Sequence, residues 1–179
     1  MVPVSSASAR VASVFGSARL REEDPEYAIA RRLGSLLAEA GWTVCTGGYD
    51  GAMAAVSRGA REAGGHVVGV TMAAWDGRLV PNAWLAEVRP AEDLFARLRA
   101  LLVTDAWLAV AGGVGTLAEI AVAWNLLQMD HVPPRPLVLV GPRWRAVLAT
   151  VERELVVGPH DLALPRVADT PEHAMALIS

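Results

Sequence analysis

Short apolar runs alternate along this chain with longer segments in which apolar residues recur every three or four positions. The run at residues 11–15 is apolar except for Ser13 and is typical of a buried strand. The following segment starts at Asp24-Pro25 and carries Ile29, Leu33 and Leu37 on one helical face. This part of the chain is therefore predicted to fold as a strand, a loop and a helix.

The same unit recurs through the rest of the chain. Further strands are expected at residues 42–45, 66–71, 85–88, 106–110, 137–140 and 166–168. Further helices are expected at residues 52–63, 91–104, 115–129 and 142–155, with a last helix beginning at Thr170. Strands that are apolar on both faces and alternate with helices predict an α/β fold, a doubly wound, Rossmann-like and mostly parallel sheet with helices on both faces.

A few segments lack either pattern. Residues 1–9 are rich in Ser and Ala and are expected to be a loose N-terminal leader, which leaves residues 10–179 as a single nucleotide-binding domain. Residues 72–84 contain Trp75 and Trp84 and are predicted to form a loop long enough to cover a site. Irregular connections are expected at residues 131–136 and 156–165.

Composition narrows the class of protein. Of the 179 residues, 53% are hydrophobic and 20% are charged, which suits a chain that buries a full core. The apolar runs are much shorter than the roughly 20 residues that span a bilayer, so no membrane association is expected. Residues 1–9 lack the plan of a signal peptide, so a cytoplasmic location is expected.

Charged residues and cysteine exclude several chemistries. The net charge is −3 and the basic residues are dispersed, so no nucleic-acid partner is expected. All 16 basic residues are arginine, and without lysine neither a P-loop nor a pyridoxal phosphate Schiff base can form. Cys45 is the single cysteine, which excludes an internal disulfide, and the four histidines show no metal-binding spacing. No metal site is predicted.

The stretch at residues 111–119, AGGVGTLAE, carries the clearest chemical signal. Gly112, Gly113 and Gly115 follow the strand at 106–110 and precede an apolar helical segment. Such glycines let the backbone approach a ligand, and the free amides at a helix start, including that of Thr116, suit an anion. The stretch is predicted to bind phosphate.

Two other glycine turns follow predicted strands. Gly16-Ser17 follows the first strand, and Gly47-Gly48 follows the second. Ligands of open parallel sheets bind beyond the carboxyl ends of the strands, where the strand order reverses. The G-x-G-x-x-G fingerprint of dinucleotide sites is missing after the first strand, so a mononucleotide is favoured over NAD.

Glu119 allows two interpretations. With Thr116 it matches a capping box, in which threonine caps the helix and glutamate binds back to the cap amide. A capping box does not require the preceding glycines, whereas a phosphate site does. Glu119 could instead orient a water or the ribose hydroxyls while positive charge develops at the anomeric carbon.

Three arginines are candidates for a forked contact with phosphate or base. Arg97 and Arg99 lie on the helix before the glycine loop, and Arg19 lies in the first glycine turn. For each of them, a solvated helix or loop position is the ordinary alternative.

The helix after the glycine loop has two apolar stripes. One contains Leu117 and Trp124, and the other contains Val122 and Met129. A second apolar face predicts either a homodimer interface or a central helix covered by the chain's own loops.

With these residues identified, the chain resembles the LONELY GUY family, cytokinin riboside 5'-monophosphate phosphoribohydrolases formerly labelled possible lysine decarboxylases. The resemblance rests on Gly16-Ser17, on the turn at residues 46–53 that ends in Met53, and on residues 112–119, which are similar to the family's Gly-Gly-x-Gly-Thr-x-x-Glu. Because the chain has no lysine, the decarboxylase label does not apply.

The resemblance implies hydrolysis of the N-glycosidic bond of AMP or an N6-modified AMP, in a homodimer without cofactor. It implies that Glu119 is catalytic, and that the glycine turns, Met53 and Thr116 bind substrate. Ala111 stands where the family has proline, and ungapped spacing puts the family's arginine at Ala96, next to Arg97. One residue rotates a helical side chain by about 100°. Either a local shift brings Arg97 into the site, or the arginine has been lost and hydrolysis is weak or absent. We expect the first, with Arg97 and Glu119 as the catalytic residues at the scissile bond. The competing hypothesis is a nucleotide or molybdenum-cofactor carrier on the same fold.

Overall fold

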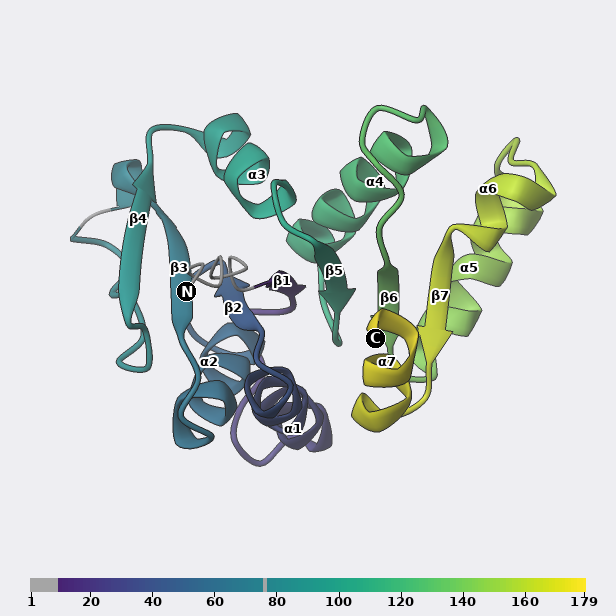
Figure 1. The fold of residues 1–179 in the computed structure, drawn as a ribbon. Coiled ribbons are helices and arrows are strands. Elements are labelled where there is room, and N and C mark those ends of the chain that lie inside the picture. The colour runs from purple at the N-terminus through teal and green to yellow at the C-terminus, as the bar shows by residue number, and fades with distance from the viewer. Residues whose placement is uncertain (1–9, 76) are drawn as a thin grey trace, which may run out of the picture.

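The computed structural model describes residues 10–75 and 77–179, and these form one parallel sheet flanked by helices (Figure 1). The strands are β1 (Val11–Phe15), β2 (Thr43–Thr46), β3 (Val67–Met72), β4 (Glu87–Ala91), β5 (Ala106–Ala109), β6 (Leu137–Val140) and β7 (Pro165–Ala168). Their order is β4-β3-β2-β1-β5-β6-β7, and each neighbouring pair is parallel. The predicted α/β class is confirmed, with a sheet that is parallel throughout these strands. The leader expected at residues 1–9 lies outside the described residues.

Helices cover both faces of this sheet. The helices are α1 (Pro25–Glu39), α2 (Ala52–Glu62), α3 (Leu94–Leu102), α4 (Val114–Gln128), α5 (Arg143–Glu154), α6 (Pro159–Ala163) and α7 (Pro171–Ile178). One core cluster joins α1, α2 and α7 to the sheet, and the other joins α3, α4 and α5 to its opposite face (Figure 1). The strand order reverses between β1 and β5, since β2 lies on one side of β1 and β5 on the other. A ligand crevice is expected at that point.

Some predicted boundaries are wrong. The strand expected at 85–88 is β4 at Glu87–Ala91, where Ala91 pairs with Met72. The helix expected at 91–104 therefore begins later, at Leu94, after Asp93 accepts a hydrogen bond from the amide of Ala96 (2.8 Å). The connection expected to be irregular at 156–165 contains the short helix α6.

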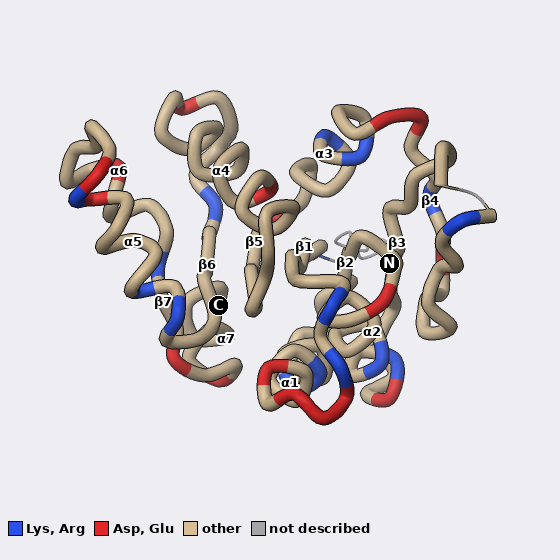
Figure 2. Tube along the Cα trace, turned by 180° about the vertical axis from the view of Figure 1, so that it is seen from behind, with Lys and Arg blue, Asp and Glu red and all other residues tan. Residues whose placement is uncertain are grey.

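Charged residues of both signs are interspersed along the described chain (Figure 2). No helix among the described residues is long and apolar enough to cross a membrane.

Candidate active site at the carboxyl edge of the sheet

The loops after β1, β2 and β5 meet at the carboxyl edge of the sheet. The amide of Ser17 donates to the carbonyl of Ala111 (3.0 Å), and the carbonyl of Ser17 accepts from the amide of Ala52 (2.8 Å). These two bonds tie the first glycine turn to the glycine loop and to the start of α2. The three glycine turns found in the sequence therefore lie next to one another, because β2, β1 and β5 are neighbours in the sheet.

The glycine loop between β5 and α4 is open on its outer side. Apart from the adjoining backbone, no atom of the described residues lies within 4 Å of where a Cβ on Gly113 or Gly115 would stand. Gly112 differs, because a Cβ there would collide with the side chain of Thr116. Gly113 caps α4 without a side-chain hydrogen bond, so the amides of the first turn have no acceptor within the helix. An anion could bind there.

The capping-box interpretation of Glu119 is wrong. Because α4 begins at Val114, Thr116 is the third residue of the helix and not its cap. Thr116 is buried beneath Gly112, while the side chain of Glu119, 13% exposed, lies toward Arg97. Glu119 therefore does not cap α4.

Arg97 lies beside Glu119 and is held there by the backbone. Its Nε donates to the carbonyl of Val70 (2.8 Å), and its Nη2 donates to the carbonyl of Gly47 (3.1 Å). Its third nitrogen, Nη1, stands 3.9 Å from Oε1 of Glu119. Arg97 is buried, whereas Arg99 is exposed. The helix start set by Asp93 thus turns Arg97 inward, toward the glutamate.

The second glycine turn lies against this arginine. A Cβ on Gly47 would collide with the guanidinium of Arg97 and approach Sδ of Met53 to 2.6 Å. Gly47, Gly48 and Met53 are all buried, and Gly47 holds Arg97 through its carbonyl. Direct contact of these three residues with a substrate stays a prediction.

Burial changes the chemistry of Glu119. Desolvation raises the pKa of its carboxyl to about 7, and the guanidinium of Arg97 acts in the opposite direction. At neutral pH such a carboxyl exists in both protonation states. It is suited to exchange a proton with a water or a substrate.

An aromatic pair beside Arg97 was missed by sequence reasoning. The rings of Tyr49 and Trp75 lie 5.6 Å apart, and Cζ of Arg97 is 6.0 Å from the first ring and 5.9 Å from the second. Trp75 lies on the 3₁₀ turn η1 (Ala73–Trp75), in the loop expected to cover a site. The only signal in the sequence was the presence of tryptophan in that loop.

Arg19 lies exposed in the first glycine turn, where its amide donates to Oγ of Ser17 (3.1 Å). Among the described residues, no group of three or more His, Cys, Asp or Glu side chains is arranged to hold a metal ion.

Comparison with known proteins identifies the family. The model of the SLOG cluster 4 family matches residues 9–129, which is more than half of the chain and contains every candidate site residue. The chain belongs to this family. The resemblance to the LONELY GUY proteins, drawn from the three glycine motifs, is thereby confirmed.

Two relatives illustrate what this SLOG chain is similar to. A protein of Archaeoglobus fulgidus, named only as uncharacterized, is 38% identical over 132 residues, which cover 73% of this chain and 83% of that protein. A protein of Oryza sativa subsp. japonica, named as a probable cytokinin riboside 5'-monophosphate phosphoribohydrolase, is 33% identical over 115 residues. That match covers 63% of this chain, which spans only 50% of the rice protein.

A solved structure with the same fold belongs to a protein with a different named function. The molybdenum cofactor carrier protein of Chlamydomonas reinhardtii aligns with a TM-score of 0.71 and 27% identity over 94% of each chain. The SLOG fold is thus shared with a protein titled as a carrier.

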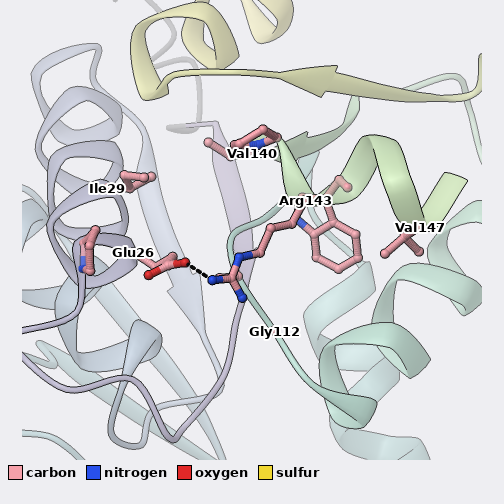
Figure 3. Close-up of a pocket in the computed structure, with 11 residues that line it drawn as sticks. Glu26, Ile29, Gly112, Val140, Arg143 and Val147 are labelled. Atoms are coloured by element: carbon pink, nitrogen blue, oxygen red, sulfur yellow. Dashed lines mark ion pairs between the residues drawn. The ribbon is translucent and has the colours of Figure 1, made fainter.

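The SLOG chain also has a cavity of about 320 Å³ between the first turns of α1 and α5 (Figure 3). Gly112 lines it, whereas Glu119 and Arg97 do not. Arg143 reaches across this cavity, and its Nη2 lies 2.8 Å from Oε1 of Glu26 (Figure 3). A second Arg–Glu pair therefore stands near the glycine loop, away from the first.

Proposed function

We propose that this chain hydrolyses the N-glycosidic bond of a nucleoside 5'-monophosphate, AMP or an N6-modified AMP, to the free base and ribose 5-phosphate. The observation that carries the proposal is the buried Glu119, 3.9 Å from Arg97, on the turn of α4 that follows an open glycine loop. Burial raises the pKa of this carboxyl to about 7. The name of the rice relative supports the same reaction.

In this proposal the glycine loop holds the 5'-phosphate. The amides of Gly113, Gly115 and Thr116 donate to phosphate oxygens, and the dipole of α4 favours the negative charge. Gly16, Ser17 and Arg19 bind from the adjoining turn. Glu119 is four residues beyond Gly115, or about 6 Å along the helix axis, which puts its carboxyl near the sugar rather than the phosphate.

Glu119 then acts on the anomeric carbon. As a carboxylate it takes a proton from a water, whose oxygen forms the new bond to that carbon. The bond to the base breaks, and the base leaves with the electron pair and takes up the proton that Glu119 accepted from the water, which regenerates the carboxylate. The carboxylate also stabilises the positive charge that develops on the sugar. Arg97 favours the ionised form of Glu119, because its charge lowers the pKa of that carboxyl.

The direct test is base release. Purified protein is incubated with AMP, and adenine and ribose 5-phosphate are quantified by chromatography. The proposal expects the two products in equal amounts at a rate proportional to enzyme concentration. AMP that binds but stays intact would contradict it.

The second candidate function is that of a carrier, favoured by the Chlamydomonas structure, which is similar over nearly the whole chain. A carrier binds its nucleotide or cofactor and returns it unchanged. The same incubation separates the two functions, since a carrier shows saturable binding by calorimetry and liberates no adenine.

We also propose that the chain works in the cytoplasm as a homodimer that pairs through α4. Leu117 and Val122 on this helix are 48% and 37% exposed, and Met129 at its C-terminal cap is 58% exposed. Exposed apolar side chains on one helix fit an interface with a second copy. Light scattering should give twice the chain mass, and Val122→Asp should give the monomer. A monomeric wild-type protein would contradict this arrangement.

A further inference from the structure

Trp75 lies beside Arg97 and Tyr49 in the candidate site. It follows β3 on the short turn η1 and is partly exposed, and its ring centre lies 5.9 Å from Cζ of Arg97. None of the roles assigned above explains why a large aromatic ring should lie there.

Neighbouring residues hold this ring in place. Tyr49, 5% exposed, packs against Trp75 with a tilt of 50° between the rings. The hydroxyl of Tyr49 accepts a hydrogen bond from the amide of Met72 (2.9 Å), just before η1. Asn82 anchors the far end of the loop, donating through Nδ2 to the carbonyl of Tyr49 (3.0 Å) and through its amide to Gly48 (2.9 Å). The segment that carries Trp75 is thus pinned to the second glycine turn.

Neighbouring contacts connect the glycine loop to Trp75. Glu119 lies on α4 just after the open glycine loop, Arg97 lies 3.9 Å from Glu119, and Trp75 lies 5.9 Å from Arg97. A nucleoside monophosphate has its sugar between its phosphate and its base. With phosphate on the loop and the anomeric carbon at Glu119, the base extends toward the aromatic pair.

We propose that the indole of Trp75 is the platform on which a purine base stacks, with Tyr49 as the residue that positions it. This inference rests on the proposed nucleotide substrate and deepens it, since it makes the base a recognised part of that substrate. Base–aromatic stacking is worth about 1–3 kcal/mol per base, and an indole offers a large flat face for a purine. Trp75 thereby contributes to the affinity for AMP and not to the affinity for ribose 5-phosphate.

The test compares ligands with and without a base. Dissociation constants of AMP and ribose 5-phosphate are measured by calorimetry for the wild-type protein, Trp75→Ala and Trp75→Phe. Trp75→Ala should weaken AMP binding about 5- to 100-fold and leave ribose 5-phosphate within twofold. Trp75→Phe, which keeps an aromatic face, should recover most of the AMP affinity.

Trp84→Ala is the matched control. Trp84 lies in the same loop, but its ring packs over Arg58, with Cζ 5.4 Å from the ring centre. This variant should bind AMP as the wild type does. Quenching of tryptophan fluorescence by AMP should be lost in Trp75→Phe and kept in Trp84→Ala.

Three results would contradict the stacking role of Trp75. The first is an equal loss of affinity for AMP and ribose 5-phosphate in Trp75→Ala, and the second is unchanged AMP affinity in that variant. The third is a Trp75→Phe variant that binds AMP as weakly as Trp75→Ala does. Failure of the proposed function is a separate result. If wild-type protein binds AMP and releases no adenine, hydrolysis is wrong, while the binding comparison still decides the role of Trp75.

Discussion

The two Arg–Glu pairs near the glycine loop differ in almost every physical respect. Arg143 and Glu26 meet directly at 2.8 Å, and their side chains are 79% and 23% exposed. Arg97 and Glu119 stand 3.9 Å apart, and their side chains are only 10% and 13% exposed. Water therefore competes with the contact between Arg143 and Glu26, whereas Arg97 and Glu119 are largely shielded from water.

The difference shows how the backbone can hold an arginine near a glutamate without a direct contact between them. An exposed ion pair is worth about 0–1 kcal/mol, and both partners are satisfied by each other. Arg97 is instead satisfied by the carbonyls of Val70 and Gly47, so its charge acts on Glu119 from a distance. Glu119 is left desolvated with its pKa near 7, which is the state a general base requires.

The largest expected effect is that of Glu119→Gln. Loss of a general base typically costs about 10²–10⁴-fold in turnover, so adenine release from AMP should fall by that factor. Glu26→Gln, the same change in the exposed pair, should keep its rate within twofold. Initial rates of adenine release from both variants are measured by chromatography. Similar losses in both variants would remove the distinction between the pairs.

Arg97→Ala should follow, with a loss of about 10²–10³-fold, because a preorganised cation beside the reacting group disappears. Arg99→Ala and Arg143→Ala should change the rate by less than twofold. Since Arg97 lowers the pKa of Glu119, the pH midpoint of the remaining activity should move upward. Equal losses in Arg97→Ala and Arg99→Ala would show that the wrong arginine had been assigned to the site.

The pH dependence gives a third test. Turnover of the wild type should fall about tenfold per unit below pH 7, as Glu119 takes up a proton. The folded-state pKa of about 7 exceeds the ordinary value of 4.5, so the stabilising contribution of this group is complete below pH 4.5 and is lost as pH rises through 7.

The variant Glu119→Gln does not lose stability as the pH rises, because glutamine does not ionise. At pH 8.5 it should be more stable than the wild type by up to about 3 kcal/mol, with little difference at pH 4.5. Urea unfolding at the two pH values measures this. An equal stability difference at both would refute the raised pKa.

The smallest effect is expected at the glycines. Gly47→Ala pushes a methyl group into the guanidinium of Arg97 and should cost about 1–3 kcal/mol of unfolding free energy, together with part of the activity. Gly113→Ala meets open space and should change stability by less than about 1 kcal/mol. Thermal unfolding compares them, and a Gly113→Ala variant that is the less stable of the two would contradict the packing described around Gly47.

Much of the fold could be predicted from the sequence because its signals are local. The run at residues 11–15 and the spacing of Leu33 and Leu37 read directly as β1 and α1. The glycine stretch likewise marked the turn between β5 and α4. Element boundaries were less secure, since Ala91 belongs to β4 only through its pairing with Met72, which the chain's own periodicity does not contain.

The sequence predicted only part of the site, because residues that meet there are far apart along the chain. Glu119 and the glycines are close in sequence, but Thr116 and Glu119 also match a capping box. The start of α4 at Val114 excludes the capping box. Arg97 and Arg99 could not be ranked from spacing. Their order was decided by the carbonyls of Val70 and Gly47, which lie 27 and 50 residues from Arg97.

By itself, the sequence determined an α/β chain with a glycine loop, a nearby carboxylate and no lysine chemistry. Only the tertiary structure decided which arginine stands beside Glu119, that Trp75 lies next to them, and that the carboxyl is desolvated. The physical reason is that helix direction and burial depend on contacts between distant strands, whereas periodicity and turn chemistry are properties of neighbouring residues.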